Sequence, residues 1–193
     1  MTIDALDLYE RLRVDNPADY REWIAAHVPA DAHIQTWGAI HDLLKTDALY
    51  ALANPNNHPQ ADFDRVVEFL VAAIDSQRIP AYMGISWLGI YVTMADRYGW
   101  VIEHPALDPD ELGRRALTCL PSTRSEAFEL AARLRVEEPR SADKLGVDQD
   151  AWLAMRSVKL ELEWVAPRIK DPQLAVTVKE WLELICRLNV VTD

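Results

Sequence analysis

The stretch from Ile79 to Trp100, IPAYMGISWLGIYVTMADRYGW, decides the fold of this chain. Between Arg78 and Asp96 it holds no charged side chain, and its apolar residues recur at the spacing of an α-helix. A helix that is apolar all round is normally buried in a protein core. The sequence therefore predicts a buried central helix over about residues 80–98.

Two further features of this stretch constrain its environment. Its uncharged run includes a proline, two glycines and two tyrosines and is shorter than the roughly 20 apolar residues that a membrane span needs. We therefore expect a core helix rather than a membrane helix. Ser86, Gly89 and Thr93 form a strip of small residues, which predicts that another backbone approaches closely and explains the presence of Gly84 and Gly89 in a helix.

The remainder of the chain alternates between amphipathic stretches and turn signals, and no stretch has the pattern of a strand. The predicted fold class is all-α, an irregular bundle or orthogonal array of about eight helices around the central one. The whole chain, residues 1–193, is predicted to form a single domain. A boundary within it, if there is one, is expected at 103–110 or 139–147, where polar turn residues gather.

Helix starts are predicted from capping residues. Asn16 before Pro17 and Asp31 are the expected N-caps of the second and third helices. Asp108 with Glu111 matches a capping box, in which each side chain satisfies an orphan backbone amide. Two later helices are expected to begin at Thr123, with Glu126, and at Asp171–Pro172.

The charge balance restricts the partners of the protein. With 31 acidic and 20 basic residues, its formal net charge is −11. Such a surface repels the phosphates of nucleic acids and of anionic membranes, so neither is an expected partner. A basic protein is the partner that electrostatics favours. The alternative is that the acids only keep the protein soluble.

Few residues have the spacing of a catalytic or metal-binding motif. The three D-x-D pairs, Asp62/Asp64, Asp108/Asp110 and Asp148/Asp150, begin predicted helices, where acids complement the helix dipole. No cofactor and no metal site is expected. Cys119 and Cys186 are predicted to be reduced core thiols of a cytoplasmic protein, although the sequence leaves a disulfide between them open.

Two functions remain open at this level. The first is a non-enzymatic protein-interaction module, of the inhibitor or immunity type, that binds a basic partner. Its expected contact surface is the acidic N-terminal third together with the loops at 54–64 and 103–111. The candidate contact residues are the acids Asp62, Asp64, Asp108, Asp110 and Glu111. The alternative is an enzyme or small-ligand-binding protein with a pocket beside the central helix. The candidate lining of that pocket is aromatic and consists of Trp37, His41, Trp87 and Tyr91. The oligomeric state is left open.

Overall fold

The structure is a computed structural model that describes residues 4–53, 59–98, 104–136 and 146–188. Within these ranges it contains helices and connecting turns and no strand, which confirms the all-α fold class. The chain divides into two compact units, Met1–His104 and Pro105–Asp193, each described below by itself. The single-domain organisation expected from the sequence stays a prediction.

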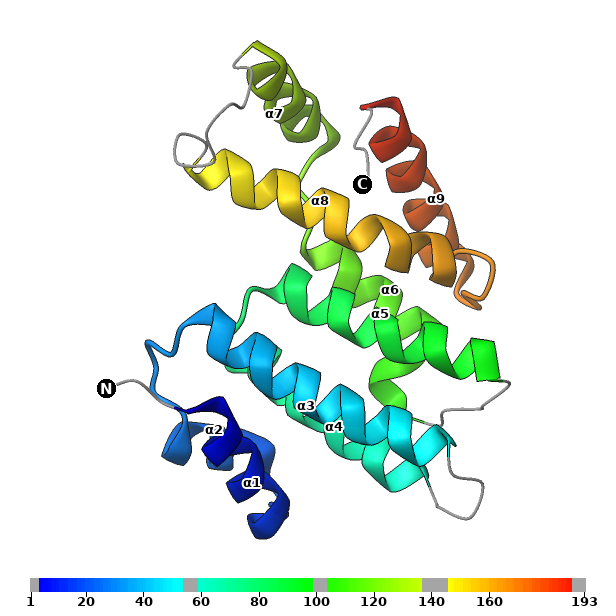
Figure 1. Cartoon of the computed structure of the whole chain (residues 1–193). Helices are drawn as coiled ribbons and strands as arrows, with labels where there is room; N and C mark the ends of the chain where they lie inside the picture. Colours follow the sequence, from blue (N-terminus) through cyan, green and yellow to red (C-terminus); the bar gives the residue numbers. More distant parts are fainter. Residues whose placement is uncertain (1–3, 54–58, 99–103, 137–145, 189–193) are drawn as a thin grey trace. The chain divides into compact units, whose positions relative to one another are not determined.

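The described residues of unit 1 form five helices, coloured blue to green in Figure 1. They are α1 (Ala5–Asp15), α2 (Tyr20–His27), α3 (Ile34–Ala53), α4 (Pro59–Asp75) and α5 (Ala81–Tyr98). Helix α1 packs on α3, and α4 contacts α2, α3 and α5. Within unit 1 it is therefore α4 that joins the largest number of helices.

Helix α5 is the helix that the apolar stretch predicted. Its residues from Tyr82 to Val92 are all buried or half-buried, and the first exposed position after them is Thr93. Its fully buried side chains recur every three or four residues, at Ile85, Leu88 and Val92, with Tyr91 beside them. The helix is therefore buried along one side and half-buried along the other, rather than covered equally all round.

In unit 2 the described residues form a short 3-10 turn, η1 (Pro105–Leu107), and four α-helices. They are α6 (Pro109–Thr118), α7 (Arg124–Val136), α8 (Gly146–Val165) and α9 (Pro172–Arg187). Helix α8 contacts α6, α7 and α9, and it buries Met155, Val158, Leu162 and Val165 almost completely. Unit 2 is therefore built on α8 (yellow to orange in Figure 1).

The described residues contain nine α-helices, where about eight were expected. None of the described helices is both long enough and apolar enough to span a lipid bilayer. Cys119 is a half-buried free thiol whose pKa burial raises to about 11, and Cys186 is an exposed free thiol.

The predicted starts of two helices in unit 1 are wrong. Asn16 ends α1 instead of beginning α2: it takes the left-handed conformation, with φ 41°, and its amide donates to the carbonyl of Leu12. Asp19 is the N-cap of α2, because it accepts from two backbone amides of the first turn. Asp31 lies in a turn, and His33 Nδ1 accepts the amide of Gln35 at the start of α3.

Two other local predictions need correction. Asp108 caps α6 by accepting the amide of Asp110 at 2.9 Å, but Glu111 bonds to arginines of its own helix instead of closing the capping box. At Gly84, one of the two glycines that a close backbone approach was expected to explain, the nearest atoms belong to side chains and not to a backbone. A methyl group there would lie 2.3 Å from Cγ1 of Ile74, so Gly84 makes room for a side chain of α4.

Candidate functional site

An aromatic cluster in unit 1 contains three of the four residues predicted to line a pocket. The imidazole of His41, on α3, stacks on the indole of Trp87, on α5, with ring centroids 4.5 Å apart and planes within 4° of parallel. Tyr91, one turn further along α5, meets the same imidazole edge-on at 5.9 Å. The i, i+4 spacing places Trp87 and Tyr91 on one face of α5, so that His41 contacts both.

Two polar atoms in this aromatic cluster are buried without a hydrogen-bond partner among the described residues. They are Nε2 of His41 and the hydroxyl oxygen of Tyr91. Both side chains are almost completely buried, at 3% and 0% exposure. An unsatisfied buried donor or acceptor costs about 1–3 kcal/mol, so the protein stabilises this arrangement through other contacts.

Burial also decides the protonation states of the aromatic cluster. Desolvation, together with the nearby Lys45 ammonium and against the opposing effect of the Asp42 carboxylate, lowers the pKa of His41 to about 4. Desolvation likewise raises the pKa of Tyr91 far above its ordinary value. At neutral pH both groups are therefore uncharged, and His41 offers one ring N–H and one ring acceptor rather than a positive charge.

Trp37, the fourth predicted residue, faces a different neighbour. It lies one turn before His41 on α3 and packs against Phe69 of α4, with ring centroids 5.8 Å apart. Phe63 of α4, which the pocket prediction did not include, meets Tyr91 edge-on at 5.9 Å. These aromatic rings pack against one another as core residues do. In the part of the chain described, no three potential ligands of the His, Cys, Asp or Glu type gather around a metal position.

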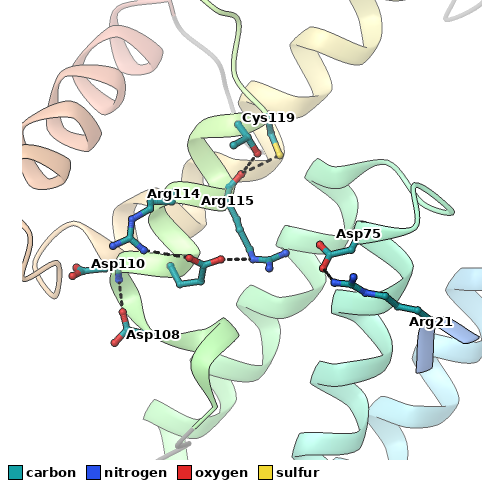
Figure 2. A network of polar contacts seen from close by, with 9 residues as sticks. Arg21, Asp75, Asp108, Asp110, Arg114, Arg115 and Cys119 are labelled. Carbon is teal, nitrogen blue, oxygen red and sulfur yellow. Dashed lines mark hydrogen bonds and ion pairs between the residues drawn. The ribbon is translucent and has the colours of Figure 1, made fainter. Parts of the chain in front are cut away.

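Three of the acids predicted to contact a partner protein belong to unit 2, and each of them bonds to another group of that unit. Figure 2 shows this for the N-terminal part of α6. Glu111 bonds to Arg115 at 2.8 Å and to Arg114 at 3.2 Å. Asp110 accepts the backbone amide of Lys170 at 2.8 Å, while Asp108 caps the helix. The Asp110–Lys170 hydrogen bond fastens α6 to the turn before α9, and all these interactions together occupy the carboxylates that a partner would need.

The other two predicted contact acids lie in α4 of unit 1. Asp64 is half-buried, and the side chain of Asp62 lies outside the described residues. The loop at 54–58, which the sequence places beside them, also lies outside the described residues. Among the described residues, the two predicted acids of unit 1 therefore form no exposed acidic cluster.

An exposed surface on α1 lies in the acidic N-terminal third that the sequence analysis expected to contact a partner, although none of its residues was named. Leu6 and Val14 are exposed to 47% and 83%, although both are large apolar residues. Glu10 lies midway between them, and steps of four residues place all three on one side of the helix. Leu8 and Leu12 lie on the opposite side and are buried. The periodicity could have revealed this outer face, because Leu6 and Leu8 cannot share one side of a helix.

Charges on α1 and α2 are unevenly paired. Over residues 4–27 the chain holds six acids and three arginines, all exposed. Arg13 pairs with Asp47 of α3 and Arg21 with Asp75 of α4, as Figure 2 shows for the second pair. The acids at Asp7, Glu10 and Glu22, in contrast, take part in no ion pair among the described residues. Arg11 is likewise exposed and in no ion pair among the described residues, so these two helices keep three unpaired acids against one unpaired arginine.

Comparison of the chain with protein families, with curated proteins and with solved structures finds no match.

Proposed function

We propose that this protein is a non-enzymatic interaction module that acts in the cytoplasm and binds a basic partner protein, in the manner of an inhibitor or immunity protein. The observation that carries the proposal is the unpaired acidity of α1 and α2: three exposed acids of these helices, against one exposed arginine (Arg11), form no ion pair in the described structure. A positively charged partner would gain favourable contacts there without first breaking internal ion pairs.

The net charge of −11 also supports binding of a basic partner, because it attracts basic molecules to the protein and repels anionic ones. The prediction about the contact residues changes, however. Asp108, Asp110 and Glu111 have internal partners, so we place the contact on unit 1. Pairing between exposed charges also implies that association weakens as salt is added.

The proposal is tested by capturing partners from the native lysate on the immobilised full-length chain at low and at moderate salt. We expect one stoichiometric basic protein at low salt and its loss as the salt concentration rises. A variant without the three unpaired charges should retain less of it. Its replacements are Asp7→Asn, Glu10→Gln and Glu22→Gln.

The matched control removes three exposed acidic charges from unit 2 and so gives the same net charge. Its replacements are Glu129→Gln, Asp150→Asn and Glu183→Gln. Equal loss of partner in both variants would mean that total charge, and not the α1–α2 surface, governs binding. Absence of any stoichiometric partner at low salt contradicts the proposed function.

A second candidate, small-ligand binding at the aromatic cluster, is favoured by one observation. His41 and Tyr91 hold two buried polar atoms without partners, and a polar ligand group would satisfy them. A ligand that binds only the folded state raises the melting temperature. If the cluster binds such a ligand, we expect a panel of small molecules to contain compounds that raise the melting temperature of the wild-type protein and not that of the variant Tyr91→Phe. A panel without such compounds argues against this function.

A further inference from the structure

We propose that the outer face of α1, formed by Leu6, Asp7, Glu10 and Val14, is the docking surface for an amphipathic helix of the partner that carries lysine or arginine beside its apolar residues. This inference rests on the proposed function and names the surface and the partner chemistry for it.

The geometry of α1 separates two faces. Each residue turns the helix by about 100°, so Leu6, Glu10, Val14 and Asp7 fall within roughly a 100° arc. The residues that pack into unit 1, Leu8, Tyr9 and Leu12, lie on the other side and hold the helix on α3. The outer face is thus presented by a helix whose own packing is already complete.

The position of α1 is held by polar contacts as well as by packing. The hydroxyl of Tyr9 donates to Asp47 of α3 at 2.6 Å, and Arg13 reaches the same carboxylate at 3.8 Å. Asp4 caps the N-terminus, and Asn16 closes the C-terminus. A partner that binds here would meet a preformed surface, which reduces the entropy lost on binding.

The chemistry of the outer face indicates the partner. Val14 at 83% exposure and Leu6 at 47% supply two apolar anchors about 12 Å apart along the helix, at 1.5 Å per residue. Glu10 lies between them and Asp7 beside them, both exposed and without an ion pair in the described structure. Of the two arginines at the edges of this face, Arg13 is paired with Asp47 and Arg11 is exposed. Apolar residues at helical spacing with flanking cations are therefore the complementary pattern, as in helices that bind by laying one face on a partner.

The probe that tests this inference is a fluorescent amphipathic peptide of leucine and lysine, with the leucines on one helical face. A scrambled peptide of the same composition and a peptide with glutamate in place of lysine are the comparison probes. Binding to the full-length protein is measured by anisotropy at low salt. We expect the amphipathic peptide to bind more tightly than both others.

The variant Leu6→Ser with Val14→Ser removes both anchors and keeps every charge. We expect it to weaken binding of the amphipathic peptide by about tenfold, the scale of losing central contact residues. The matched control is Val176→Ser on α9, an apolar residue of 53% exposure in unit 2, and it should leave the affinity unchanged. Far-UV circular dichroism and the melting temperature confirm that each variant is folded.

The outcomes separate this inference from the proposed function. Equal binding of the amphipathic and scrambled peptides, or equal binding by the wild type and the α1 variant, overturns the docking surface and leaves the binding of basic partners intact. If neither lysine-containing peptide binds even at low salt, both the docking surface and the preference for a basic partner are contradicted.

Discussion

His41 shows how a single ionisable residue can remain uncharged in a core. Its imidazole is held between Trp87 and Tyr91, away from water, and this burial lowers its pKa to about 4. The unfolded chain binds the proton near pH 6.5, whereas the folded chain does not until about pH 4. Above pH 6.5 neither state binds this proton, so the free energy of unfolding is not reduced by His41. As the pH falls from 6.5 toward 4, only the unfolded chain takes up the proton, and the free energy of unfolding decreases.

The corresponding prediction concerns acid stability. Replacing His41 with Phe keeps an aromatic ring against Trp87 and removes the titration. Because one pKa unit corresponds to about 1.4 kcal/mol, the wild type should lose about 3 kcal/mol more than the variant between pH 7 and pH 4. Urea unfolding across this pH range measures the difference. A control replacement, His33→Gln, removes an exposed imidazole, and an equal effect there would contradict the assignment.

Two glycines in helices of unit 1 differ in the space around them. A methyl group on Gly84 of α5 would overlap Ile74 of α4, whereas one on Gly38 of α3 would meet no atom within 4 Å. We expect Gly84→Ala to destabilise the protein by about 1–3 kcal/mol through overpacking. We expect Gly38→Ala to stabilise it by up to about 1 kcal/mol through helix propensity. Chemical denaturation measures both, and a stabilising Gly84→Ala would show that α4 and α5 pack less closely.

At the scale of the element, capping residues decide where the helices begin. Asp171 accepts the amides of Gln173 and Leu174 at 2.9 and 3.2 Å, so one carboxylate satisfies two orphan donors of α9. Pro172 at the first helical position has no amide hydrogen to satisfy. This start could be predicted because the cap and the proline are adjacent in the chain.

Replacing Asp171 tests how much its capping of α9 contributes to stability. Asp171→Ala should destabilise the protein by about 1 kcal/mol, while Asp171→Asn, which keeps an accepting oxygen, should cost less. Thermal unfolding distinguishes the two variants. Glu183→Ala, an exposed acid within the same helix, controls for the lost charge. If the Asn and Ala variants are equally destabilised, charge rather than hydrogen bonding explains the effect.

For the whole molecule, excess negative charge is the dominant electrostatic property. A net charge of −11 on 193 residues implies self-repulsion, which is weakened by added salt. We expect the melting temperature at pH 7.5 to rise by a few degrees between low and moderate salt. Near the isoelectric point of about 4.9 the response should largely vanish. Differential scanning calorimetry at both pH values measures it, and a melting temperature that falls with salt at pH 7.5 contradicts this prediction.

The sequence by itself determined the helical content of both units and the course of α5. Helical content and helix bounds depend on the spacing of apolar residues and on capping residues a few positions apart, so they can be read from short stretches of sequence. The same local information led to the wrong start for α2. Asparagine is common both as an N-cap and as a left-handed residue at the end of a helix, and in the structure Asn16 ends α1 while Asp19 caps α2.

Only the tertiary structure decided which side chains meet and which remain exposed. The sequence proposed Trp37, His41, Trp87 and Tyr91 as one set, but helix packing joined the last three and turned Trp37 toward Phe69. It also engaged the acids of α6 inside unit 2 and left those of α1 without ion-pair partners in the described structure. Periodicity specifies the face of a helix on which a residue lies, whereas its neighbour is specified by contacts between residues far apart in the chain.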